Sequence, residues 1–138
     1  DVFVIASNAG VNGTIVGLAL LAKEHGHGVI WVTSLDHTRQ VTPKHPSGKR
    51  LSEIADVVID NLAPYGDTTL TVGDGIGVGA VSSMTAAYIA QLLTIGVAER
   101  LVAAGTVPPI YLSANIPSGD EHNHELEARY GDRLRRHA

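Results

Sequence analysis

The first seventeen residues carry the pattern that most constrains how this chain can fold. An uninterrupted apolar run, residues 2–6, precedes a cluster of small polar residues and glycines, residues 7–14, and a helical apolar pattern begins at Ile15. A continuous apolar run is typical of a parallel strand covered on both faces. A strand, a tight turn and a helix in this order leave helix N-terminal amides without partners, and such amides attract anions, phosphate above all.

The following residues extend this start into an alternating strand and helix pattern. We expect an amphipathic helix over residues 11–25, ended by Gly26, and a second buried strand over residues 29–32. A third short buried strand is expected over residues 56–60, after a short helix at residues 51–55. The β-α-β unit should cross over with a right hand.

Residues 69–80 allow two interpretations. Gly75, Gly77 and Ala80 match the dinucleotide pattern G-x-G-x-x-A. However, Asp74-Gly75 is a strong hairpin turn between segments of alternating polarity, and Pro108-Pro109 stands where the motif needs another strand. We therefore predict a hairpin of residues 69–72 and 76–78, and no cofactor.

One long helix is predicted over residues 80–104, capped by Ser82 or Ser83 and stopped by Gly105. Its apolar residues spread round much of its circumference, so we expect it to be enclosed, partly by another chain or a missing segment. Its serines, Thr85 and Gln91 suit a buried helix better than a membrane span.

Two polar segments remain. Residues 39–50 hold Pro43, Pro46 and Gly48 among five Lys, Arg and His residues, which indicates either a solvated surface loop or a basic lid near an anionic ligand. After a short extended piece at residues 110–112, residues 120–136 have the pattern of a charged, exposed helix.

Composition narrows the class of protein. The 138 residues are expected to form one domain, and their net charge of −4 argues against nucleic-acid binding. Cysteine is absent, which fits a cytoplasmic protein, and neither a membrane partner nor a metal is expected. Because its first residues already form a strand, we expect the chain to be truncated at the N-terminus.

The loop at residues 7–12 resembles the S-x-S-G-x-T loop of sugar isomerase (SIS) domains, which wraps the phosphate of a phosphosugar. Three further segments are similar to SIS landmarks: residues 32–37 (VTSLDH), 55–61 (ADVVIDN) and 113–123 (SANIPSGDEHN). The last looks like a largely uncharacterised bacterial subgroup, and the resemblance runs from about residue 2 to about residue 130.

The resemblance implies a three-layer α/β/α fold of the SIS, flavodoxin-like kind, with a mainly parallel sheet and the hairpin as an insertion. The apolar circumference of the long helix separately predicts a dimer or larger homo-oligomer. Ala9 replaces the family's second serine and Asn12 its threonine. One lost neutral hydrogen bond costs only about 0.5–1.5 kcal/mol, so a phosphate cradle can survive Ala9. A whole SIS domain has another strand and loop before residue 1, which supply the other half of the site.

These observations define the candidate site. The expected substrate-binding residues follow the strands or open the long helix: Ser7, Asn8, Ala9, Gly10, Asn12, Thr33, Ser34, Ser82 and Ser83. Aldose–ketose isomerisation through an enediol needs a base that is active near neutral pH. The candidates are His37, Glu121 and His122.

Three functions remain open at this point. The chain is a phosphosugar isomerase or lyase, a non-catalytic phosphosugar-binding or regulatory module, or a structural dimerising half-domain. Each candidate residue also has a structural alternative: Gly10 and Asn12 can simply make the turn, and the serines can simply cap helices. Metal binding by Glu121, His122, His124 and Glu125 is disfavoured, because positions i and i+2 do not share a helix face.

Overall fold

The computed structural model describes residues 1–131 and residue 133. The chain divides into two compact units, Asp1–Leu93 and Thr94–Ala138. The first unit holds the sheet and the loops that follow its strands, and each unit is described by itself below.

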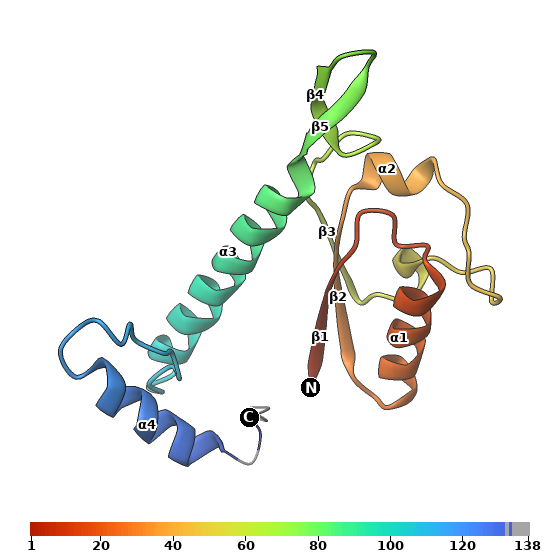
Figure 1. Ribbon diagram of the computed structural model, residues 1–138. Coiled ribbons are helices and arrows are strands. Elements are labelled where there is room, and N and C mark those ends of the chain that lie inside the picture. The colour runs from red at the N-terminus through yellow and green to blue at the C-terminus, as the bar shows by residue number, and fades with distance from the viewer. Residues whose placement is uncertain (132, 134–138) are drawn as a thin grey trace. The chain divides into compact units, whose positions relative to one another are not determined.

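A three-stranded parallel sheet forms the centre of the first unit (Figure 1). Its strands are β1 (Val2–Ala6), β2 (Gly28–Thr33) and β3 (Val57–Asp60), in the order β1-β2-β3. All three predicted strands are therefore confirmed, and the fold is α/β with a small parallel sheet. The finer three-layer, flavodoxin-like arrangement stays a prediction.

Helix α1 (Gly13–Glu24) packs against one face of this sheet (Figure 1). The core there is aliphatic apart from Trp31, and its buried members are Ile5, Ala19, Ala22, Val29, Trp31 and Leu51. Small alanines on the helix let it approach the sheet closely, because they leave room for the large indole. Burying this apolar surface stabilises the unit by roughly 25 cal/mol per Å².

The opposite face of the sheet is only partly covered within the first unit: Val32 of β2 is buried there, whereas other residues are not. Val2 and Val4 of β1 and Val57 of β3 are each about half exposed or more. Parallel sheets are normally covered on both faces. This apolar face is thus available to polypeptide outside the first unit.

Two short helices link β2 to β3. Residues 35–39, expected as a polar cluster, form α2 (Leu35–Arg39), while η1 (Leu51–Glu53) is a 3₁₀ turn within the predicted short helix. Between them, the Lys44 N–H donates to the Val11 carbonyl (3.0 Å) and the Leu51 N–H to the Gly10 carbonyl (2.9 Å). The middle of the basic segment and the residue that follows it are therefore fastened to the loop after β1.

The predicted hairpin is confirmed. Strands β4 (Thr68–Val72) and β5 (Ile76–Ala80) pair in antiparallel fashion, with Leu70 opposite Val78. Gly73 and Gly75 adopt φ of 52° and 86° in the turn, a region that favours glycine. The glycines thus serve the turn, as the hairpin interpretation required.

Helix α3 (Val81–Ala103) follows β5 directly. The sequence-based prediction of its cap was wrong, because Asp67 rather than Ser82 or Ser83 accepts the first amides. The Asp67 carbonyl accepts from the Val81 N–H (2.9 Å), and its carboxylate accepts from the Ser82 N–H (2.8 Å). The hairpin therefore begins directly after Asp67, and the residues that follow it, Val81 and Ser82, bond Asp67 again.

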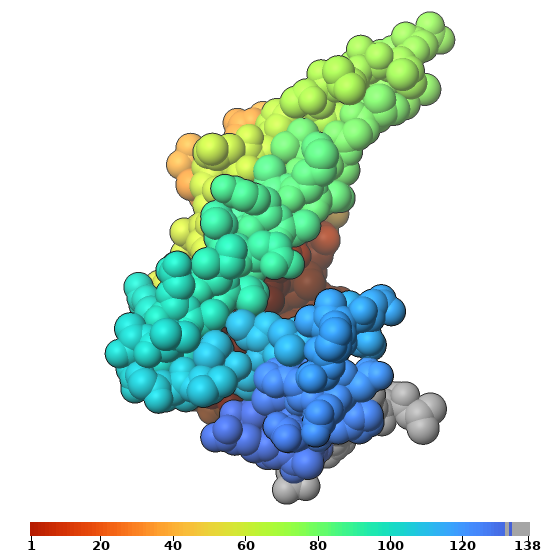
Figure 2. All heavy atoms as spheres, turned by 90° about the vertical axis from the view of Figure 1, so that its left-hand side faces the viewer, coloured from red at the N-terminus to blue at the C-terminus, as the bar shows by residue number. Residues whose placement is uncertain are grey.

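The expected enclosure of α3 is not provided by the described residues, because no residue of the helix is buried. Figure 2 shows the outer side of residues 81–93, in green, with no other segment of the first unit over it. Within the described residues, α3 is also the one helix long and apolar enough to cross a membrane, which by length and composition alone is weak evidence.

The second unit contains α4 (Gly119–Tyr130). The charged helix was predicted from Asp120, one residue after the observed start of α4 at Gly119. Residues 132 and 134–136 at its predicted end lie outside the described residues. The extended piece expected at residues 110–112 does not form a strand. Instead, the Asn123 side chain bonds both the N–H and the carbonyl of Leu112, at 2.8 Å each.

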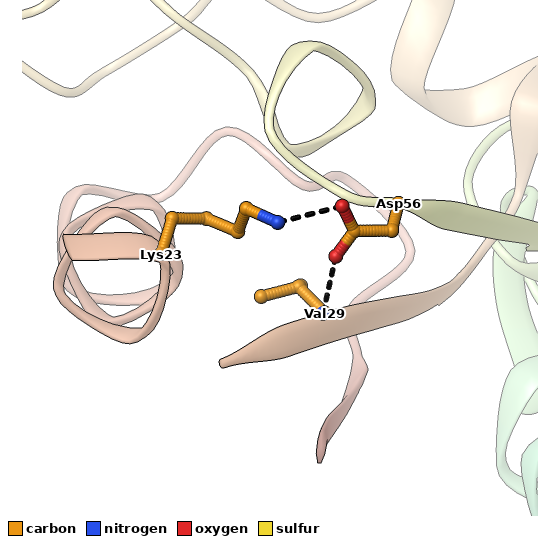
Figure 3. Close-up of polar contacts among 3 residues, drawn as sticks. All are labelled: Lys23, Val29 and Asp56. Carbon is orange, nitrogen blue, oxygen red and sulfur yellow. Dashed lines mark hydrogen bonds and ion pairs between the residues drawn. The ribbon is translucent and has the colours of Figure 1, made fainter. Parts of the chain in front are cut away.

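Asp56, just before β3, joins three elements of the first unit (Figure 3). Its carboxylate accepts from Lys23 Nζ of α1 (2.6 Å) and from the Val29 N–H of β2 (2.8 Å). These two hydrogen bonds, that of Lys23 foremost, lower the pKa of Asp56 below its ordinary value of 3.8.

We predict that Asp56→Asn lowers the melting temperature at neutral pH and that the difference from the unmodified chain vanishes in acid. A lowered folded-state pKa gives stability that is present above the unfolded value and is lost as pH falls through the folded one. The difference should therefore shrink below about pH 4, measured by circular dichroism melts between pH 2 and pH 8. A pH-independent difference would contradict the assignment.

Candidate functional site

A pocket of about 190 Å³ lies at the carboxyl ends of the parallel strands, beside the start of α3. It is lined by Ala6, Ser7, Asn8, Val32, Asn61, Ser82, Ser83 and Ala86. Every lining residue belongs to the first unit. This edge is where open α/β sheets bind ligands, and four of the residues are among those predicted from sequence: Ser7, Asn8, Ser82 and Ser83.

The loop that carries Ser7 is shaped by Trp31 of β2. Trp31 is fully buried, and its indole Nε1–H donates to the Ser7 carbonyl (2.8 Å). Gly10 turns back over the indole with φ of +60°, and its N–H donates to Ser7 Oγ (3.3 Å). The serine hydroxyl therefore already accepts one hydrogen bond from its own loop.

Asn8 is held by Asn61, which immediately follows β3. The Ala63 N–H donates to Asn61 Oδ1 (3.0 Å), and Asn61 Nδ2 donates to Asn8 Oδ1 (2.7 Å). Asn8 Nδ2 is then left buried and without a hydrogen-bond partner among the described residues. A buried donor without an acceptor costs about 1–3 kcal/mol, so this amide favours any ligand that brings an acceptor.

The two serines of α3 differ in what they offer. Ser82 Oγ donates to the Asp67 carboxylate (2.5 Å), whereas Ser83 is exposed at the pocket. The Ser82 amide at the start of α3 is not open to an anion, because the chain's own Asp67 carboxylate already accepts it. Ser83 keeps its predicted position at the site.

Thr33 and Ser34 do not line the pocket. Both are completely buried: Thr33 Oγ1 donates to the Asn8 carbonyl (2.9 Å), and Ser34 Oγ donates to the Ala63 carbonyl (2.5 Å). Ser34 also accepts from the His37 N–H (2.9 Å) and so caps α2. The capping alternative describes Ser34, and both hydroxyls support the loops that bear Asn8 and Asn61.

The remaining residues of the first loop lie beside the pocket rather than on its wall. The Ala9 carbonyl accepts from Thr38 Oγ1 (2.6 Å), and Gly10 is buried against Trp31. Asn12 is the N-cap residue of α1, but its side chain makes no capping hydrogen bond, and no acidic residue lies in the first turn. The N-terminus of α1 thus has no acceptor side chain of its own at the cap.

The three predicted bases are not gathered at the pocket. His37 stacks on Tyr65 with ring centroids 5.2 Å apart, and its Nδ1 accepts from the Gly66 N–H (3.2 Å). Glu121 and His122 belong to α4 in the second unit, where His122 Nε2 lies 2.9 Å from the Ile110 carbonyl oxygen. No His or Glu side chain lines the pocket.

Among the residues that the structure describes, no group of three His, Cys, Asp or Glu side chains could hold a metal ion. The pocket instead offers hydroxyl and carboxamide groups. Such groups bind oxygen-rich ligands and supply neither a base nor a redox centre. Chemically, the pocket wall presents neutral hydrogen-bonding groups, among them the Asn8 Nδ2 donor that has no partner within the described residues.

Sequence reasoning missed three residues that build this site: Trp31, Asn61 and Asp67. Asn61 closes the segment ADVVIDN, and a polar residue directly after a buried strand is the signal that could have identified it. Asp67 could not be found in this way, because thirteen residues of hairpin separate it from the helix it caps.

This chain is similar to several curated bacterial proteins. It is 38% identical over 136 residues to a UPF0309 protein of Oceanobacillus iheyensis, which covers 97% of this chain and 55% of that protein. It is 42% identical over 134 residues to a UPF0309 protein of Brucella anthropi, covering 96% of this chain and 54% of that protein. The chain spans about half the length of these relatives, and no family model matches it.

We predict that Gly10→Ala destabilises the first unit more than Gly26→Ala does. Both glycines have positive φ, which costs a non-glycine residue about 1–2 kcal/mol. A Cβ at Gly10 would also lie 2.1 Å from Trp31 Cζ2, whereas a Cβ at Gly26 meets nothing within 4 Å. The clash should add about 1–3 kcal/mol, measured by urea unfolding. Equal losses would mean that the loop does not rest on the indole.

Proposed function

We propose that this chain binds a phosphorylated sugar at the pocket between the β1 loop and the start of α3. The observation that carries the proposal is Asn8 Nδ2, a buried donor without an acceptor on a residue of the pocket wall. Phosphate oxygens are acceptors, and charge-assisted hydrogen bonds are roughly twice as strong as neutral ones. Ser83 is positioned to bond either a phosphate oxygen or a sugar hydroxyl.

Two further observations support an oxyanion ligand. The pocket lies at the ligand-binding edge of a parallel sheet, and the resemblance of the loop at residues 7–12 to SIS domains implies a phosphate there. On that resemblance we propose that the chain is an SIS domain, and its lack of cysteine is the reason to propose a cytoplasmic location. The Asp67 carboxylate opposes an anion close to Ser82, so the phosphate is proposed to lie nearer Ser7 and Asn8.

Binding without catalysis is favoured over isomerisation within this chain. Proton transfer at a sugar carbon needs a base within hydrogen-bond reach of it, and the pocket wall contains none. Isomerase or lyase activity therefore requires groups that the pocket wall does not contain. The pocket, at about 190 Å³, is also smaller than the ~300–1,000 Å³ of typical ligand sites.

We predict that sugar phosphates raise the melting temperature of the chain. The panel comprises glucose 6-phosphate, fructose 6-phosphate, the parent sugars and inorganic phosphate, read by differential scanning fluorimetry. A ligand at 100 times its dissociation constant stabilises a protein by about 2.7 kcal/mol. The double variant Ser7→Ala, Asn8→Ala should lose the shift, because both residues line the pocket.

The matched control is Ser52→Ala, Asn115→Ala, which removes the same groups from exposed positions that do not line the pocket. It should keep the full shift. A shift retained by the first double variant would place the site elsewhere, and no shift with any phosphate would refute the proposal.

We further propose that α3 packs against a second copy of this chain. Met84, Tyr88, Ile95 and Val102 recur along one side of the helix at 100° per residue, and all are more than half exposed. Such a stripe suits helix–helix packing.

We predict that Ile95→Glu shifts the chain toward monomer, measured by light scattering after size-exclusion chromatography. Val97→Glu is the matched control, because Val97 is equally exposed but points to the other side of the helix. Equal behaviour of the two variants, or an unmodified chain that is monomeric, would contradict packing by this stripe.

A further inference from the structure

Asn61 is the residue whose function nothing in the sequence patterns had assigned. It is 5% exposed and follows the last residue of β3, where its N–H donates to the Thr33 carbonyl (2.7 Å). Its side chain connects the segment after β3 to the loop after β1. This connection spans 53 residues of sequence, so it reports on tertiary structure rather than on a local turn.

The direction of the hydrogen bonds along this connection is determined at one end. A backbone N–H can only donate, so the Ala63 amide requires an oxygen from Asn61. The NH₂ group of Asn61 must then face Asn8, and Asn8 must turn its oxygen toward it. The NH₂ group is consequently the part of Asn8 that is left without a partner among the described residues.

The Ala63 end is itself fixed. The Ala63 carbonyl accepts from the buried Ser34 hydroxyl, and Ala63 is 1% exposed. The Ala63 backbone therefore has little freedom to turn its amide away from Asn61. Reversing the Asn8 amide would place two NH₂ groups against each other at 2.7 Å, which repel.

We propose that Asn61 is a positioning residue that fixes Asn8 as a donor, so that the pocket accepts a ligand oxygen and rejects a donor group such as an ammonium at that point. This inference rests on the proposed function and adds the residue that gives it selectivity. Asn8 contacts the ligand, and Asn61 acts through Asn8.

The test reverses the direction of the hydrogen bond between residue 61 and Asn8. In Asn61→Asp, the carboxylate still accepts from the Ala63 N–H but offers an acceptor to Asn8, so the Asn8 amide turns and presents its oxygen to the ligand. The same charge placed at Leu62, the exposed neighbour with φ of 59°, is the control, because Leu62→Asp does not touch Asn8. Aspartate is well tolerated at positive φ.

The measurement is a titration of the ¹⁵N-labelled chain with glucose 6-phosphate and with inorganic phosphate, following the side-chain NH₂ signals of Asn8 and Asn61. In the unmodified chain, the Asn8 NH₂ signal should move most. Asn61→Asp should weaken binding of both probes about tenfold or more, and Leu62→Asp by about threefold or less. Binding of glucose 6-phosphate but not inorganic phosphate would show that the sugar part is also required.

Each outcome separates the two proposals. If the unmodified chain binds neither probe, the proposed function fails and this inference fails with it. If it binds but Asn61→Asp and Leu62→Asp weaken binding equally, charge alone explains the effect and the inference fails by itself. Should Asn61→Asp not fold, the neutral Asn61→Ala frees the Asn8 amide to rotate. Unchanged affinity in that variant would overturn the inference.

Discussion

The contact between Trp31 and the loop after β1 is the interaction on which the rest of the first unit depends. One indole closes the core beneath α1, donates to the Ser7 carbonyl, and requires glycine at position 10. The packing of the core and the shape of the pocket wall are therefore set by the same side chain. A smaller residue would cost the core its largest apolar contact and would leave the loop without its support.

A second network fixes the polar groups of the site. Thr33, Ser34 and Asn61 come from the ends of β2 and β3, and each bonds backbone or side chain in a neighbouring loop. Because these groups are buried, water does not compete for their hydrogen bonds, and each bond offsets the cost of desolvating the groups that make it. Three loops that are far apart in sequence are thereby held as one rigid edge, with the Asn8 amide at its centre.

Much of this arrangement was predictable from sequence, and the exceptions have physical causes. Strand positions followed from apolar runs, and the hairpin followed from Asp74-Gly75, because these signals are local. The cap of α3 was not predictable, since its acceptor, Asp67, lies across an intervening hairpin. For the same reason the bonds from Ser82 to Asp67 were not predicted, although Ser82 lines the pocket together with Ser7, Asn8 and Ser83. The exposure of α3 was not predicted, because an apolar composition indicates that a helix packs against other polypeptide but not which segment or chain supplies that polypeptide.

The closure at Asp67 has a consequence for how such a chain can vary. The Val81 amide returns to the Asp67 carbonyl, and both ends of the hairpin meet at its base. Nothing in the pocket wall comes from between these two points. The β4–β5 hairpin can therefore differ in length and in tip sequence among related proteins without changing the residues that line the pocket. It is the part of the first unit where such proteins can acquire different surfaces.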